Sequence, residues 1–160
     1  MPTVITILNG PNLNCLGRRE PEIYGTKTLE DIEQFCKEWA IKFDMTLRFY
    51  QSNSEGQLVE WIQEALEVSS GLIINPAAYS HTSVAILDAL KMFSGPKVEV
   101  HLSNIYHRET FRRHSYVSAG VDAVISGCGY EGYRFALEYI AKRFKIGVEE
   151  LKLYNLNKGI

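Results

Sequence analysis

Five short runs of apolar and β-branched residues recur along the chain, and each is followed by a polar loop. Between them lie stretches with the apolar spacing of helices, one from Leu29 to Phe43 and another from Leu58 to Leu66. Strands that alternate with helices need crossover connections, which give a parallel sheet covered on both faces. The pattern predicts a doubly wound α/β fold with five strands, at residues 3–8, 46–50, 71–75, 97–102 and 121–126.

The loops that follow these strands are where a ligand site is expected. Open parallel sheets bind ligands outside the carboxyl ends of their strands, where the strand order reverses. Four of the loops are rich in side chains that form hydrogen bonds or titrate, whereas the loop after the fifth strand is rich in glycine. Candidate chemistry therefore lies at 9–25, 51–56, 75–83 and 101–115.

Length and composition indicate one ordinary domain over residues 1–160, with 46% hydrophobic and 22% charged residues. The formal net charge of −2, with mixed signs, gives no basic footprint for nucleic acid. The apolar runs are too short for a membrane span, and the N-terminus has no signal-peptide pattern. The three cysteines have neither disulfide-framework nor metal-ligand spacing, which favours reduced thiols and a cytoplasmic location.

The loop after the first strand contains Arg19 and Tyr24. A tyrosine accepts a proton only as its phenolate, and a guanidinium within about 4–6 Å favours that form. Arg19 could supply this charge. The alternative is that Tyr24 packs its ring on the surface beside solvated arginines, and this loop taken alone favours the alternative.

The loop after the third strand offers Asn75 and His81, followed by Asp88. His81 and Asp88 are seven residues apart, so on one helix they would share a face and could hold hydroxyl groups. Alternatively, Asn75, Thr82 and Ser83 turn the chain and cap a helix that begins near residue 82. Without further information, capping is the favoured interpretation.

The fourth strand ends in Glu99 and His101. Alternation along a strand places both on one side, where the carboxylate can orient the imidazole as a general acid. A structural histidine is the common alternative. Arg108, Arg112 and Arg113 follow, with guanidinium groups suited to a carboxylate or hydroxyl oxygens, or to solvent.

Two other kinds of chemistry find little support. The histidines form no compact ligand pair, and no cysteine pair assists them, so no metal site is expected. Cys15 lies in the first loop without an identifiable base partner, while Cys36 and Cys128 look like core or loop residues.

Six blocks, in the right order between residue 3 and about residue 140, resemble the type II 3-dehydroquinate dehydratases: NGPNLN, LGRREPEIYG, QSNSEG, INPAAYSHTS, EVHLSN and RETFRRHS. The resemblance implies a flavodoxin-like fold and a lyase. This lyase converts 3-dehydroquinate to 3-dehydroshikimate through an enolate, without metal or cofactor. The sequence leaves open whether the reaction serves aromatic biosynthesis through shikimate or quinate breakdown.

The resemblance also implies catalytic roles. Tyr24 matches the tyrosine that takes a proton from C2, and Arg19 matches the arginine that favours its phenolate and steadies the transition state. Asn12 matches the asparagine that helps hold the enolate, through an ordered water. His101 matches the general acid that protonates the departing C1 hydroxyl, with Glu99 behind it.

For substrate binding, the resemblance implies that ring hydroxyls contact Asn75, His81, Asp88 and Arg112, and that the carboxylate contacts Ser103 and the Leu102 backbone. Members of the family assemble as a tetramer of trimers in which the matching aspartate reaches a neighbouring site. A homododecamer is therefore expected. The segment after about residue 144 goes beyond the shared pattern, and its role is not evident.

Two rival interpretations predict other residues. A flavodoxin-like module that binds a flavin or phosphate would need small hydroxyl residues and glycines after the first strand. This chain has asparagines, arginines and a tyrosine there. An inactive relative would be expected to lose Tyr24, Arg19 or His101, and all three are present.

Overall fold

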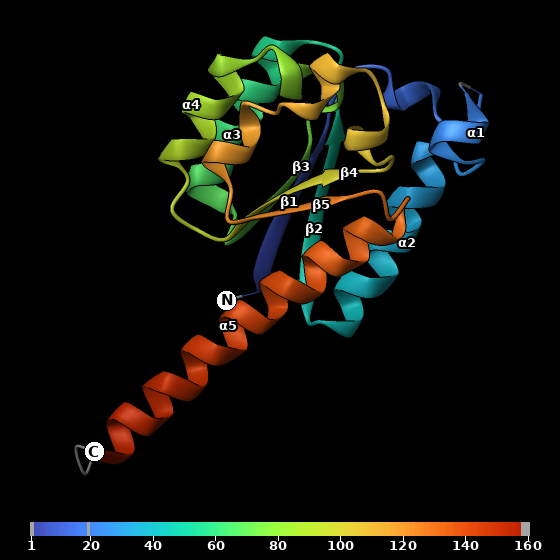
Figure 1. Ribbon diagram of the computed structural model, residues 1–160. Coiled ribbons are helices and arrows are strands. Elements are labelled where there is room, and N and C mark those ends of the chain that lie inside the picture. Colours follow the sequence, from blue (N-terminus) through green and yellow to red (C-terminus); the bar gives the residue numbers. More distant parts are fainter. Residues whose placement is uncertain (1, 19, 158–160) are drawn as a thin grey trace.

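A computed structural model describes residues 2–18 and 20–157, with side chains to residue 145 (Figure 1). Its five strands form one parallel sheet in the order β2-β1-β3-β4-β5, which is the flavodoxin-like order. The predicted sheet is confirmed, although β4 ends and β5 begins slightly inside the predicted limits. The strands are β1 (Thr3–Asn9), β2 (Met45–Gln51), β3 (Gly71–Asn75), β4 (Lys97–His101) and β5 (Ala123–Ser126).

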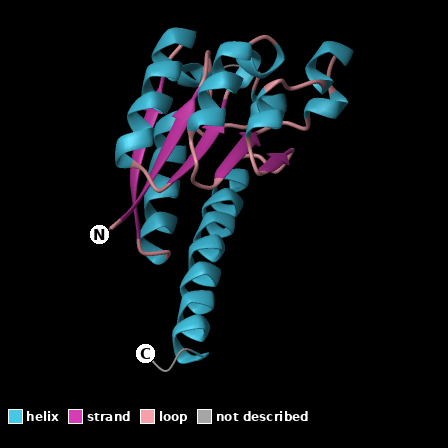
Figure 2. Cartoon of the chain, turned by 90° about the vertical axis from the view of Figure 1, so that its left-hand side faces the viewer, coloured by secondary structure: helices cyan, strands magenta, loops and turns pink. Residues whose placement is uncertain are grey.

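Helices cover both faces of this sheet (Figures 1 and 2). One face packs against α2 (Leu29–Lys42) and α5 (Glu131–Asn157), and the other against α3 (Glu55–Val68) and α4 (Val84–Met92). The short helix α1 is Pro21–Tyr24. The loops also contain 3-10 turns: η1 (Leu13–Cys15), η2 (Ala77–His81), η3 (Ile105–His107), η4 (Thr110–Arg113) and η5 (Val117–Gly120).

Hydroxyl side chains fix where three of the helices begin. Thr28 forms a capping box with Asp31 at the start of α2, while Ser54 and Ser83 accept hydrogen bonds from backbone amides of α3 and α4. The predicted capping role of Ser83 is confirmed. Because Ser83 interrupts the helix, His81 lies in η2 and Asp88 in α4, so the prediction that they share one helix face is wrong.

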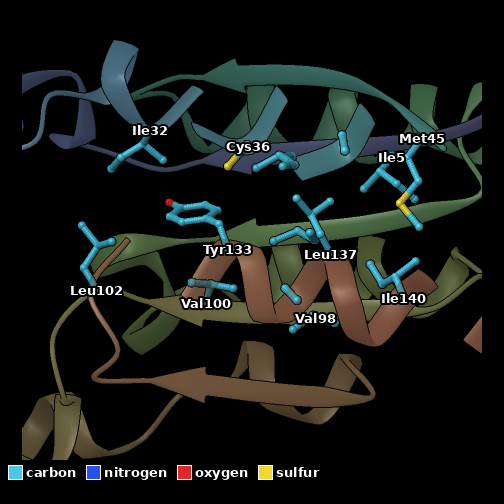
Figure 3. Packing of buried hydrophobic residues seen from close by; sticks show 14 of the residues in the cluster. Ile5, Ile32, Cys36, Met45, Val98, Val100, Leu102, Tyr133, Leu137 and Ile140 are labelled. Atoms are coloured by element: carbon cyan, nitrogen blue, oxygen red, sulfur yellow. The ribbon is translucent and has the colours of Figure 1, made fainter. Parts of the chain in front are cut away.

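Alternation along the central strands divides the core into two layers. Ile5 and Ile7 of β1 point to the α2 and α5 side, whereas Leu8 points to the α3 and α4 side. Figure 3 shows part of the first layer. Cys36 is buried there as predicted, and burial raises the pKa of its thiol to about 12. The apolar spacing placed Leu66 on the buried face of α3, but this residue is 38% exposed, so the prediction is wrong there.

The strand order reverses between β1 and β3, and polar residues end both strands. The register sets Asn9 directly beside Gln51 on one side and Asn75 on the other. Beyond the strands, the Gly10 amide donates to the Asn75 carbonyl at 2.8 Å. The two loops approach so closely here that a Cβ atom on Gly10 would lie 2.3 Å from the Pro76 carbonyl oxygen.

Helix α5 is much longer than the sheet requires. Its 27 residues include the buried Tyr133, Leu137 and Ile140, and Figure 1 shows its later part projecting beyond the sheet near the start of β1. Across residues 2–18 and 20–157, no helix combines the length and apolar character needed to cross a membrane.

Gly10 provides a test of the close approach between the loops after β1 and β3. We expect Gly10→Ala to lower the free energy of unfolding by about 1–3 kcal/mol, because the added methyl group overlaps backbone atoms that cannot rotate away. Gly56→Ala in α3 is the matched control, since the nearest atom to the added Cβ would be the Ser54 Oγ, at an unstrained 3.9 Å. Denaturant unfolding should show the control at or above wild type. Equal stability of Gly10→Ala and wild type would contradict the packing argument.

Candidate active site

A cavity of about 240 Å³ lies at the carboxyl ends of the strands. It is small and mixes polar with apolar walls, which suits a small ligand that offers several hydrogen-bonding groups. Its walls come from the loops after β1, β3 and β4, as the fold class predicts. The lining residues are Pro11, Asn12, Leu13, Tyr24, Asn75, Ala77, Ala78, His81, His101, Leu102, Ser103, Ile105, Arg108 and Arg112.

The loop after β2 supports the loop after β1. Asn12 has a left-handed backbone, with φ 68°, and its amide donates to Asn53 Oδ1 at 2.9 Å. The Gln51 side chain donates to the Gly10 carbonyl at 3.2 Å and to Asn53 Oδ1 at 3.1 Å. These bonds hold the turn that brings Asn12 to the cavity wall.

Tyr24 enters the cavity from the end of α1 and is half-buried. The Arg108 guanidinium lies 5.3 Å from the centre of its ring, within the range of a cation–π interaction. A second, more open cavity also borders Tyr24 and Arg108, and includes Lys27 and His107 in its wall. Arg19, which the sequence predicts as the partner of Tyr24, lies outside the described residues.

Glu99 and His101 occupy one side of β4, as alternation predicts, and are in contact. Their short hydrogen bond joins His101 Nε2 to Glu99 Oε2, so Nδ1 is the ring nitrogen that remains for the cavity. Glu99 does not line the cavity. It is fully buried and accepts further hydrogen bonds from Ser115 at 2.9 Å and Ser118 at 2.7 Å.

These contacts determine the charge of Glu99. Burial acts to raise the pKa of its carboxyl group. The hydrogen bond and positive charge of His101, with hydrogen bonds from Ser118 and Ser115, outweigh burial and hold this pKa below its ordinary value. Glu99 therefore remains a carboxylate at neutral pH, and its hydrogen bond fixes the orientation of the imidazole beside it.

His81 has a different environment. Its Nδ1 lies 2.8 Å from the His114 carbonyl oxygen, which can only accept, so Nδ1 carries a hydrogen and Nε2 is left as an acceptor when the ring is neutral. Burial lowers the pKa of His81, although the bond to His114 acts against it. The nearby positive charges of His101 and Arg112 lower it further. His81 is therefore mainly neutral at pH 7.

The loop after β3 holds a strained residue at the cavity wall. Ala77 has φ 52°, a left-handed conformation that costs a residue with a Cβ atom about 1–3 kcal/mol. Its amide donates to Asn75 Oδ1 at 3.2 Å, which helps hold the turn. Asn75 thus does more than turn the chain, because it also lines the cavity.

The remaining predicted residues divide into two groups. Leu102, Ser103 and Arg112 line the cavity, and Arg112 also pairs with Glu109 at 2.6 Å. Asp88 does not line it, and its side chain is exposed on α4.

Sequence reasoning left several participants out of the predicted site. Arg108 was one of three candidate arginines, and the structure places it in the cavity wall. Ser115 and Ser118 donate hydrogen bonds to Glu99 from 16 and 19 residues away. Ser115 is the last residue of the RETFRRHS block, but sequence reasoning assigned it no role. Nothing in the sequence drew attention to Ser118. Within the described part of the chain, no group of three or more His, Cys, Asp or Glu residues is arranged to hold a metal ion.

Comparisons with known proteins give a consistent result. Residues 3–141 match the family model described as dehydroquinase class II. The 3-dehydroquinate dehydratase of Bartonella tribocorum is 78% identical over 143 residues, covering 89% of this chain and 96% of that protein. Its counterpart in Streptomyces avermitilis is 59% identical, covering 89% and 91%. The crystal structure of a type II dehydroquinase from Propionibacterium acnes matches with a TM-score of 0.86 and 45% identity, covering 89% and 98%.

The support of Glu99 can be tested through stability. We expect Ser118→Ala to lower the free energy of unfolding by about 1.5–3 kcal/mol, because a buried carboxylate oxygen loses a hydrogen bond. Ser69→Ala is the control. Its hydroxyl pairs with the uncharged Thr6 hydroxyl, so its loss should cost about 0.5–1.5 kcal/mol. If denaturant unfolding gave Ser118→Ala the smaller loss, the ionised, hydrogen-bonded state of Glu99 would be in doubt.

Proposed function

Because the chain belongs to the class II dehydroquinase family, we propose that it removes water from 3-dehydroquinate to give 3-dehydroshikimate. The family resemblance of the six sequence blocks is confirmed by the family match and by relatives that cover most of the chain. One structural observation carries the proposal. A tyrosine from α1 and a carboxylate-paired histidine from β4 line the same small cavity, which is what an elimination with separate base and acid needs.

In the proposed first step, Tyr24 acts as the base. Its phenolate takes the proton from C2 of the substrate, and the electron pair of the broken C–H bond delocalises into the neighbouring carbonyl as an enolate. Arg19 favours the phenolate, and Arg108 supplies a second positive charge beside the ring. Asn12 stabilises the enolate oxygen through a water molecule.

In the proposed second step, His101 acts as the acid. The enolate collapses to form the C1–C2 double bond, the C1–O bond breaks, and the departing hydroxyl takes a proton from the imidazolium to leave as water. The pairing of His101 Nε2 with Glu99 supports this role, because the buried carboxylate orients the imidazole and leaves Nδ1 to face the substrate. Acting from opposite sides of the ring, Tyr24 and His101 give an anti elimination.

The other cavity residues are proposed to orient the substrate. Ser103 and the Leu102 backbone bind its carboxylate, while Asn75, His81 and Arg112 bind its ring hydroxyls. The neutral state of His81 supports this assignment, because its free Nε2 can accept a hydrogen bond from a hydroxyl group. The reaction as written needs no metal or cofactor, and residues 1–160 are proposed to act as one catalytic domain.

Asp88 is proposed to complete a neighbouring subunit's site. Its exposed position on α4, away from the cavity of its own chain, supports a role across a subunit interface. We accordingly propose a homododecamer built as a tetramer of trimers. A cytoplasmic location is also proposed, and the exposed thiols of Cys15 and Cys128 support a reducing compartment.

The base can be tested by the ultraviolet absorbance of the conjugated enone product. Wild type should form the product with and without borohydride, since no imine is involved. Tyr24→Phe should lower kcat by at least about a hundredfold, because the phenyl ring fills the space without accepting a proton. Tyr106→Phe, at an exposed position outside the cavity, should match wild type. Substantial turnover by Tyr24→Phe would rule out the tyrosine base.

The shared site can be tested by complementation. Asp88→Ala and Tyr24→Phe should each be nearly inactive alone. When both are refolded together in equal amounts, roughly a quarter of the sites would combine an intact Tyr24 with an intact Asp88 from a neighbour, so activity should return. Light scattering would report the assembly size. If Asp88 served its own subunit, no hybrid site would contain both residues and the mixture would stay inactive.

A further inference from the structure

Tyr133 is a buried polar residue to which the proposed reaction assigns no task. Its ring is fully buried on α5, among the apolar side chains between this helix, α2 and the sheet (Figure 3). Its hydroxyl donates to Asn9 Oδ1 at 2.6 Å and accepts from Asn75 Nδ2 at 3.1 Å. Tyr133 therefore reaches the carboxyl ends of β1 and β3 from within the core, without lining the cavity.

The direction of these hydrogen bonds is fixed at one end. Asn9 Nδ2 donates to the Tyr50 carbonyl oxygen at 3.0 Å, and a backbone carbonyl can only accept. If the Asn9 amide were turned over, two acceptor oxygens would face each other. Asn9 therefore presents Oδ1 to Tyr133, which commits the single phenol hydrogen to Asn9.

The orientation of the Asn75 side-chain amide is fixed in the same way. Because the Tyr133 hydrogen points to Asn9, the phenol oxygen can only accept from its other neighbour, and Asn75 must present Nδ2 to it. Asn75 Oδ1 in turn accepts from the Ala77 amide. Turning the Asn75 amide over would break both bonds at once.

We propose that Tyr133 is a positioning residue that fixes Asn75 as a hydrogen-bond donor to a substrate oxygen. The inference rests on the proposed function. Asn75 lines the cavity, and one hydrogen of Nδ2 is used by Tyr133, so the second hydrogen remains for the ligand. The orientation that binds substrate is thus set before the substrate arrives, and no binding energy is lost in selecting it.

The hydrogen-bond relay from Asn75 through Tyr133 to Asn9 also keeps its direction near neutral pH. Burial raises the pKa of Tyr133 above its ordinary value, although the bond from Asn75 acts against this effect. The phenol therefore keeps the hydrogen that it donates to Asn9.

The test is Tyr133→Phe, which retains the ring and its packing but removes the hydroxyl. We expect kcat/KM to fall roughly tenfold, mostly through a higher KM, because Asn75 binds a substrate group in both the ground state and the transition state. Tyr139→Phe is the matched control. It lies on the same helix and packs against the same apolar layer, and its hydroxyl accepts from Arg143, so KM should be unchanged.

A double-mutant cycle separates positioning from general destabilisation. In an Asn75→Ala background, Tyr133→Phe should have no further effect on KM, since the residue through which it acts is gone. A loss of the same size in both backgrounds, or an unchanged KM for Tyr133→Phe alone, would overturn the inference.

Two further results keep the test decisive. If Tyr133→Phe does not fold, Asn9→Ala interrupts the relay one step earlier and should raise KM in the same way, and a wild-type KM there would also overturn the inference. A folded wild-type enzyme with no activity on 3-dehydroquinate would instead defeat the proposed function and this inference with it.

Discussion

The site depends on the in-register pairing of β1 and β3 at the point where the strand order reverses. This pairing sets Asn9 beside Asn75, and the bond from the Gly10 amide to the Asn75 carbonyl extends it one residue past the strands. Two loops that must diverge toward different helices are therefore held together where they begin. The absence of a side chain at Gly10 makes this closeness possible, because any Cβ atom would overlap Pro76. The cavity forms where the loops finally separate.

Because successive residues of a strand point to opposite faces of the sheet, polar side chains at the site reach into both layers of the core. Asn9 and Asn75 point toward α5, where Tyr133 holds them through uncharged hydrogen bonds. Glu99 and His101 point to the opposite side, where serines near η5 hold the carboxylate. A buried polar group is costly unless it is satisfied, and every described buried side-chain nitrogen or oxygen has a partner. An uncharged hydrogen-bond network and a carboxylate–histidine pair thus meet at one cavity without sharing a hydrogen bond.

Local patterns in the sequence predicted the strands, helices α2 and α3, the start of α4 and the contact of Glu99 with His101, but not the long helix α5. Each of these depends on residues close together along the chain, where the periods of strands and helices decide which side chains share a face. The contacts of Tyr133 could not be predicted in this way, since 124 residues separate it from Asn9 and its spacing on α5 is that of an ordinary core residue. The shared helix face of His81 and Asp88 failed for a local reason. Counting seven residues assumed a continuous helix, whereas Ser83 begins a new one.

The end of β1 also bears on how the protein ages chemically. Asn9 and Gly10 form an Asn–Gly pair, the dipeptide most prone to deamidation, in which the glycine nitrogen attacks the asparagine side-chain carbonyl to form a succinimide. Here that nitrogen donates to Asn75, while the Asn9 amide is held by Tyr50 and Tyr133. Neither partner can turn toward the other while the strand end is folded. The contacts that order the site therefore also protect its most labile peptide link, and lasting damage requires the fold to open first.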